Sequence, residues 1–280
     1  MNQFSMAADS VTTEIPALQD EVFLGHIRLN TTNDNYIKNR LAKVFCDTLS
    51  QFPFSKNEIA VRGIIDNFFL RYKPSIPDTL IKQAGSTSLA GLLPLYVVSR
   101  LIDPDMIIES GVFVGSSLHM FSSTFDRLPI YAFDINLKKL RVKPDNASLN
   151  EMDWSQFNNL PRHDNTLAFF DDHINCAKRI LECQSKGVRW AIFDDSPPVG
   201  RLFNYRYPAI PSIPMIMDES IPDGCAFEWC HQPTNTTIKY VHNSEICSSA
   251  RNAIRRVTSL DLLMAIAGVS SGDKWLVEIA

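Results

Sequence analysis

The second half of the chain alternates short apolar runs with segments in which apolar residues recur every three or four positions. Five of the apolar runs have the length of buried strands, which is about 4–8 residues. This alternation is typical of βαβ units and of an open, mostly parallel α/β sheet. The predicted strands cover residues 106–109, 130–133, about 147–150, 166–170 and 188–193.

Apolar residues at helical spacing also predict three helices before the sheet, over residues 33–52, 59–70 and 89–102. They make up a helical cap segment, 31–104, ahead of an α/β domain over 105–280. Residues 1–30 are polar, and we expect them to form an N-terminal arm. If the chain forms a homo-oligomer, we expect the N-terminal helices to provide the contact.

A crossover helix over residues 173–183 is predicted between the fourth and fifth strands, so both strands end at the same edge of the sheet. The tail predicts a strand at 237–241, a helix over 250–263 and a closing strand at 274–279. That helix would carry Arg251, Arg255 and Arg256. Charged residues on a helix more often form a solvated face than a ligand site, so we expect a solvated face here. The proline- and aromatic-rich segment 196–236 predicts an ordered lid or substrate wall; a packing loop without ligand contact is the alternative.

Composition narrows the classes of partner. The 280 residues are 45% hydrophobic, which suffices for one large α/β domain. A net charge of -4 and a pI near 5.9 do not favour nucleic acid or an anionic membrane as partner, so a small molecule is expected. The longest apolar segment, 89–98, contains Pro94 and is far shorter than the roughly 20 residues that span a bilayer. No signal-peptide core precedes it, and six cysteines lack framework spacing, so we expect reduced thiols and a cytoplasmic protein.

Two of the predicted strands end in paired aspartates. The fourth runs into Asp171 and Asp172, and the fifth into Asp194 and Asp195. Ligands of open parallel sheets bind beyond the carboxyl ends of the strands, where these four carboxylates would converge. Because close carboxylates repel one another unless a cation neutralises them, the pattern predicts a site for a hard divalent ion such as Mg²⁺.

A glycine turn follows the first strand, with Glu109, Gly111, Gly115 and Ser116 leading into a helix. Without a third glycine in the G-x-G-x-x-G pattern, a dinucleotide is not well specified. The segment instead resembles the first motif of class I S-adenosylmethionine-dependent methyltransferases, acidic-x-Gly-x-x-x-Gly. Asp134 ends the second strand at about the distance expected of a ribose-binding acid.

Residues 105–195 as a whole resemble the metal-dependent O-methyltransferase branch, which includes catechol-type and macrocin-type enzymes and cephalosporin-hydroxylase-like proteins. The resemblance implies a Rossmann-like, doubly wound fold and S-adenosylmethionine as cofactor. It implies that the glycine-turn residues, Asp134 and Asp153 bind this cofactor, with Trp154 near the adenine or, equally, buried in the core. It further implies that Asp171 or Asp172, together with Asp194 and Asp195, binds the metal. Asp172 is as readily explained as a helix N-cap.

The general base is less well specified. Catechol-type enzymes place a lysine just after the fourth-strand Asp-His, whereas here the nearest lysine is Lys178, further along the helix. His173 is the nearest candidate, because imidazole titrates near neutrality. His231 and His242 are alternatives, and a structural hydrogen-bonding role for His173 is an equal reading.

These features favour an O-methyltransferase that acts on a hydroxylated small molecule such as a sugar or polyol. Two other functions remain open: a cephalosporin-hydroxylase-like oxidoreductase, which would require iron, and a ligand-binding protein of the same fold without catalysis. The sequence shows no evident two-histidine, one-carboxylate triad for iron. A zinc site at Cys225, Cys230 and His231 is not expected either, because no second pair of ligands follows at finger spacing.

Overall fold

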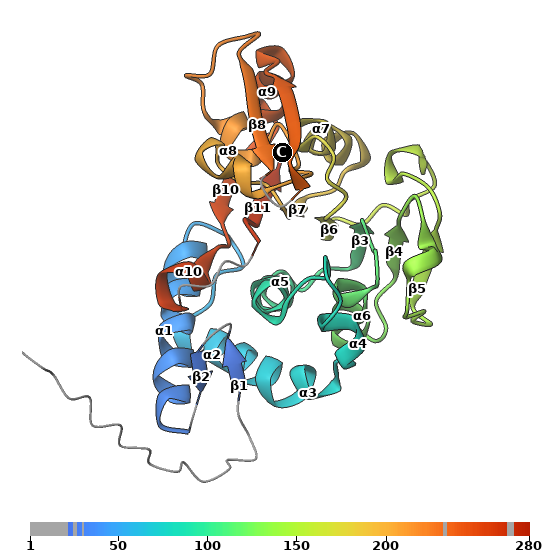
Figure 1. Ribbon diagram of the computed structural model, residues 1–280. Coiled ribbons are helices and arrows are strands. Elements are labelled where there is room, and N and C mark those ends of the chain that lie inside the picture. Colours follow the sequence, from blue (N-terminus) through green and yellow to red (C-terminus); the bar gives the residue numbers. More distant parts are fainter. Residues whose placement is uncertain (1–21, 25–26, 30, 232–233, 268–271) are drawn as a thin grey trace, which may run out of the picture.

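The computed structural model describes residues 22–24, 27–29, 31–231, 234–267 and 272–280 (Figure 1). Its centre is a seven-stranded sheet in the order β10-β11-β7-β6-β3-β4-β5. The strands are β3 (Met106–Ser110), β4 (Ile130–Phe133), β5 (Ala147–Asn150), β6 (Thr166–Phe170), β7 (Trp190–Phe193), β10 (Ile254–Ser259) and β11 (Trp275–Ile279).

The sheet is parallel except at one strand. β3 pairs in parallel with β4 and β6, β4 with β5, and β6 with β7, whereas β11 runs antiparallel to both β7 and β10. From β3 the chain builds outward to one side through β4 and β5, and then to the other through β6 and β7. The carboxyl ends of these five strands therefore lie along one edge, with the reversal of strand order between β3 and β6. This order confirms the doubly wound, mostly parallel fold that the sequence predicts.

Helices cover both faces of the sheet, because side chains alternate between the faces along each strand. On β6, Leu167 and Phe169 face one hydrophobic cluster, while Ala168 and Phe170 face the other. The first cluster joins the N-terminal helices and α6 (Ser116–Thr124) to the sheet. The second joins α7 (Cys176–Lys186), α8 (Ile213–Met217) and α9 (Ser244–Asn252) to it.

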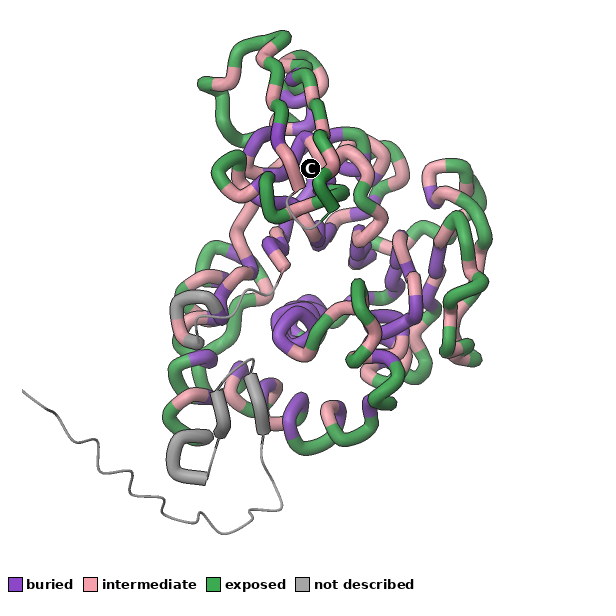
Figure 2. The backbone as a smooth tube through the Cα atoms, in the orientation of Figure 1, coloured by how far each residue is buried: buried purple, intermediate pink, exposed green. Residues whose placement is uncertain are grey.

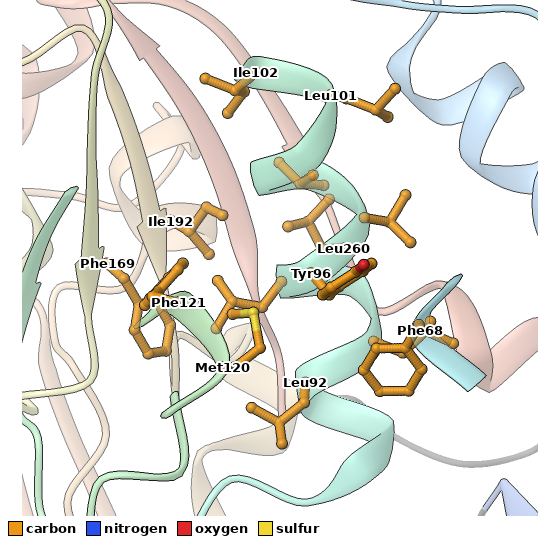
Figure 3. Close-up of a cluster of buried hydrophobic side chains, with 14 of the residues drawn as sticks. Phe68, Leu92, Tyr96, Leu101, Ile102, Met120, Phe121, Phe169, Ile192 and Leu260 are labelled. Carbon is orange, nitrogen blue, oxygen red and sulfur yellow. The ribbon is translucent and has the colours of Figure 1, made fainter. Parts of the chain in front are cut away.

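The cap segment centres on α5 (Leu89–Ile102), a helix buried almost throughout its length, which Figure 2 shows below the sheet. In Figure 3 its side chains lie between Phe169 and Ile192 of the sheet on one side and Phe68 on the other. The other elements of this segment are α1 (Thr31–Leu49), α2 (Glu58–Asn67), the π-helix η1 (Phe68–Tyr72), α3 (Lys73–Ser75) and α4 (Asp78–Ile81). The helices predicted in this region are confirmed, although the second changes to π-helical geometry at Phe68. None of the helices in the described ranges has both the length and the apolarity to cross a bilayer.

The predicted helix over 250–263 is wrong. α9 ends at Asn252, β10 follows at once, and α10 (Leu262–Ala267) comes after it. Residues 254–259 form the edge strand β10 by pairing with β11, and this pairing outweighs the helical periodicity of their sequence. Arg255 and Arg256 consequently lie on a strand rather than on a helix with Arg251, and Arg256 pairs with Glu278 of β11.

The segment 196–236 contains ordered elements, among them the 3₁₀ helix η4 (Val199–Asn204), α8 and the start of a hairpin. The predicted strand at 237–241 belongs to this hairpin, in which β8 (Ala226–His231) pairs with β9 (Thr236–Val241) apart from the main sheet. Two further 3₁₀ turns are η2 (Leu137–Lys139) and η3 (Trp154–Gln156). The expected arm contains one short pair of strands that was not predicted, β1 (Val22–Leu24) and β2 (Ile27–Leu29). The rest of the arm, residues 1–21, 25–26 and 30, lies outside the described residues.

Candidate active site

A cavity of about 970 Å³ opens at the carboxyl ends of the parallel strands. Its volume is within the range of small-molecule sites, roughly 300–1,000 Å³. Segments from distant parts of the chain line it: the loops after β3, β4, β5, β6 and β7, residues 84–88 ahead of α5 and Gly91 within it, Arg206 and Tyr207, and the connection before β11. Of the predicted site residues, those lining the cavity are Gly111, Asp134, Asp153, Asp171, Asp172, His173, Asp194 and Asp195.

The glycine turn lies against the loop that follows β6. Gly111 has φ +90°, and a Cβ there would lie 2.3 Å from the carbonyl oxygen of Asp171, so only glycine fits. Gly115 also has a positive φ, +93°, but a Cβ there would meet the side chain of Val142, and Gly115 does not line the cavity. Gly111 therefore brings the two loops together, whereas Gly115 allows α6 to begin.

Asp134 connects the end of β4 to this turn. Its Oδ2 accepts hydrogen bonds from the backbone N–H groups of Val112, at 3.0 Å, and Phe113, at 2.9 Å, and its Oδ1 accepts one from Asn136 at 2.8 Å. A carboxylate has about four lone-pair sites, so Oδ1 can still accept one hydrogen bond from a ligand in the cavity.

Glu109 and Ser116 lie beneath the turn rather than in the cavity. Glu109 is fully buried, and burial raises its pKa to about 8, although Ser117 donates a 2.5 Å hydrogen bond to its Oε1. Its Oε2 has no hydrogen-bond partner in the described part of the chain. Ser116 donates its hydroxyl to the carbonyl of Leu80. Both side chains support the turn from below, and neither is placed to touch a ligand directly.

A buried arginine links the ends of β5 and β6. Arg179 of α7 pairs with Asp153 at 2.8 Å, with Asp172 at 2.8 Å and with Glu182 at 2.7 Å. Burial alone would raise the pKa of Asp153, but hydrogen bonds from Arg179 and Ser155 hold it well below its usual value. Trp154 is fully buried, donates its indole N–H to Glu182 and does not line the cavity, which matches the core alternative.

The two aspartate pairs each contain one carboxylate that already has a cation. Asp172 pairs with Arg179 and accepts a 2.6 Å hydrogen bond from Ser110, and it also accepts the N–H of Ile174. Its N-cap alternative is wrong, because Asn175 caps α7. Asp194 pairs with the buried ammonium of Lys274 at 2.6 Å.

The other carboxylate of each pair faces the cavity beside an imidazole. Ligand atoms of Asp171, His173 and Asp195 all lie within 4.8 Å of one another, and His173 Nδ1 is 3.3 Å from Asp195 Oδ2. Burial and the charges of Asp194 and Asp195 raise the pKa of Asp171 well above its usual value. Burial and Asp194 raise the pKa of Asp195 to about 7. Carboxylates held together in this way are a set of donors that suits a hard divalent cation.

The backbone at this cluster is strained. His173 has φ 56° and Asp195 has φ 47°, a region that side-chain-bearing residues seldom occupy. The N–H of Asp195 donates to the carbonyl of Gly272 and to its neighbour's Oδ1, while its carbonyl accepts the N–H of Ala209. Such conformations persist where surrounding structure enforces them, and they concentrate at functional sites.

Other candidates from the sequence are not brought to the cavity. Lys178 pairs with Glu182 on α7, His242 is buried near the hairpin, and His231 lies beside Thr234. Among the described residues, the acidic cluster contains one histidine, His173.

Sequence reasoning missed both counter-cations of the aspartate pairs. Arg179 lies three residues before Glu182 and seven after Asp172, a helical spacing that could have indicated the network. Lys274 gives no such signal, because it reaches the site only through the pairing of β11 with β7. A Cβ on neighbouring Gly272 would lie 2.8 Å from Asp194 Oδ1, so the connection before β11 packs directly on this pair.

No protein-family model and no curated protein matches the chain. Among solved structures, it is similar to cmcI with Mg and SAM at a TM-score of 0.44 and 14% identity, over 75% of this chain and 84% of that one. It is similar to an O-methyltransferase from Bacillus cereus in complex with SAH at a TM-score of 0.40 and 12% identity, over 84% of this chain and 96% of that one. It is also similar to the SAH-bound methyltransferase PaMTH1 from Podospora anserina at a TM-score of 0.37 and 14% identity, over 92% of this chain and 100% of that one. The strand order and strand directions, rather than these superpositions, establish the fold.

Proposed function

We propose that the chain is an S-adenosylmethionine-dependent O-methyltransferase that uses a divalent ion to methylate a hydroxylated small molecule. The observation that carries this proposal is the presence of two different sites in one cavity. Gly111 and Asp134 form a glycine turn with an acidic strand end, and Asp171, His173 and Asp195 form an acidic cluster within the same walls. Methyl transfer from a sulfonium to a hydroxyl requires both reactants to be held in line, which one shared cavity allows.

The cofactor would occupy the side of the cavity formed by the glycine turn. The backbone of Gly111 lines the cavity there, and Asp134 Oδ1 has a lone pair available for a ribose hydroxyl. Asp153, fixed by Arg179, lines the cavity at the end of β5. Glu109 acts indirectly, by filling the space below the turn with a protonated carboxyl.

Asp171 and Asp195 would supply the oxygens that hold the ion, since Mg²⁺ is commonly bound through one or two carboxylates and keeps other positions for water or substrate. Asp172 and Asp194 have Arg179 and Lys274 as partners, so a divalent ion would balance the charges of Asp171 and Asp195 when both are ionised. When bound, the ion increases the acidity of a hydroxyl on a substrate that chelates it, and neighbouring hydroxyls of a sugar or polyol are suited to chelation.

His173 would remove the proton of that hydroxyl. Its Nδ1 lies beside Asp195 Oδ2, which orients the ring and leaves Nε2 to accept a proton. The ring is partly exposed at the cavity wall, within reach of an entering acceptor.

Calorimetric titration of dialysed protein with S-adenosylmethionine, with and without Mg²⁺, tests the proposal. We expect saturable cofactor binding that Asp134→Asn weakens by about tenfold or more, because hydrogen bonds to a charged group are lost. Asp145→Asn, an exposed aspartate outside the cavity, is the matched control and should bind as the wild type does. Failure of the wild type to bind S-adenosylmethionine would contradict the proposal. Cofactor binding without turnover of any diol or polyol acceptor would favour the non-catalytic alternative.

A further inference from the structure

Two exposed side chains with the chemistry of ligand recognition line the cavity and are not used by the proposed mechanism. They are Arg206 and Tyr207, which follow η4 in the segment after β7. The Arg206 guanidinium carbon lies 4.9 Å from the centroid of the Tyr207 ring, a cation–π arrangement that keeps the two side chains together.

The backbone on both sides of this pair is anchored. The Tyr205 hydroxyl donates a 2.6 Å hydrogen bond to Asp273, and the Tyr205 carbonyl accepts one from the Trp229 indole. On the other side, the N–H of Ala209 donates to the carbonyl of Asp195 at 2.9 Å. Arg206 and Tyr207 therefore lie on an anchored segment that is hydrogen-bonded to the backbone of Asp195, whose carboxylate is proposed to hold the ion.

Arg206 differs from the other cations on the cavity wall. Arg179 and Lys274 are buried in ion pairs with aspartates, and Lys139 lies over the Phe113 ring beside the glycine turn. Arg206 is exposed and has no carboxylate partner among the residues that the structure describes, although the cavity has six aspartates in its wall. An arginine fork that is not paired with a protein carboxylate is suited to two-point binding of a carboxylate or phosphate.

We propose that Arg206 and Tyr207 select an acidic acceptor: a hydroxylated ring compound that carries an oxyanion. The inference rests on the proposed function and names the substrate class of the same site. Arg206 binds the oxyanion, and Tyr207 packs against the ring, while the hydroxyls reach the acidic cluster. An ion at Asp171 and Asp195 removes the excess negative charge there, so an anionic acceptor can approach despite the aspartates.

Ligand-observed NMR titration of protein loaded with Mg²⁺ and S-adenosylhomocysteine provides the test, with glucose, glucuronate and glucose 6-phosphate as probes. We expect at least one of the two acids to bind about tenfold more tightly than glucose, as charge-assisted hydrogen bonds imply. Which acid does so distinguishes a carboxylate from a phosphate. Arg206→Gln should abolish the preference, Arg206→Lys should retain part of it, and Arg255→Gln, an exposed arginine on β10 outside the cavity, should leave it intact.

Equal affinity for glucose and both acids, binding of none of the three, or a preference that survives Arg206→Gln would overturn the inference. Cofactor titration of the same samples separates this outcome from failure of the proposed function. Wild type and Arg206→Gln that bind S-adenosylmethionine alike, with no preference for acids, contradict only the acidic acceptor. Wild type that does not bind the cofactor contradicts the methyltransferase itself.

Discussion

The ends of β6 and β7 have the same dipeptide, two consecutive aspartates, but the member that pairs with a buried cation differs between them. After β6 the second aspartate, Asp172, is neutralised by Arg179, and the first faces the acidic cluster. After β7 the first aspartate, Asp194, is neutralised by Lys274, and the second faces the cluster. The counter-cation comes from the adjacent helix α7 in one case and from the distant connection before β11 in the other.

This difference divides the four carboxylates at one sheet edge into two that are ion-paired and two that lie beside His173. All four line the cavity, but each pair has one carboxylate in an ion pair with a buried cation and one in the acidic cluster. Asp171 and Asp195 are the two members without a lysine or arginine partner among the described residues, and burial together with the charge of Asp194 raises the pKa of both. Under the proposed function, a divalent ion would bind at Asp171 and Asp195 rather than at all four carboxylates.

The largest effect is expected at the end of β7. Lys274→Met leaves the buried carboxylate of Asp194 without its cation, and breaking a buried ion pair in this way costs about 3–5 kcal/mol. Denaturant unfolding of the metal-free protein measures the loss. The double variant Lys274→Met with Asp194→Leu should recover much of it, since neither charge then remains buried. A double variant as unstable as the single one would show that the ion pair is not what Lys274 contributes.

A third strand end, that of β3, extends the comparison because Glu109 has no lysine or arginine partner among the residues that the structure describes. Burial raises the pKa of Glu109 to about 8, above the ordinary value near 4.5, so the folded protein binds a proton that the unfolded chain releases. Stability from this group is full below about pH 4.5 and is lost as pH rises toward 8. Relative to Glu109→Gln, the wild type should lose about 3 kcal/mol of unfolding free energy between pH 4.5 and 7.

Unfolding free energies of wild type and Glu109→Gln over that pH range check this expectation. Glu245→Gln, which removes an acid in the first turn of α9, is the comparison variant, and its pH dependence should follow the wild type. Parallel curves for wild type and Glu109→Gln would mean that Glu109 is ionised in the folded protein.

The smallest effect is expected at the end of β6. Asp172→Asn keeps the shape of the side chain, and Arg179 retains Asp153 and Glu182 as partners, so we expect a loss of only about 1 kcal/mol. The same unfolding assay measures it. A loss as large as that of Lys274→Met would show that the two strand ends are equally dependent on their counter-cations.

The central strands were predictable because they are continuous apolar runs, and the runs at 130–133 and 166–170 match β4 and β6. The strand at residues 254–259 was not predictable. Its sequence has helical periodicity, and no local pattern reveals that it pairs with β11. For the site, the aspartates were visible as strand ends, but which of each pair faces the cavity depends on Arg179 and Lys274. The position of Lys274 follows only from tertiary structure, and so does that of Arg206.

The central claim is that Asp171 and Asp195 hold the ion, whereas Asp172 and Asp194 are ion-paired within the protein. Titration of dialysed protein with Mn²⁺, followed by electron paramagnetic resonance, tests this claim most directly. Asp171→Asn and Asp195→Asn should weaken Mn²⁺ binding by about a hundredfold, since each removes a ligand oxygen charge, whereas Asp172→Asn should stay within about threefold of wild type. Loss of binding in Asp172→Asn together with wild-type binding in Asp195→Asn would contradict the account.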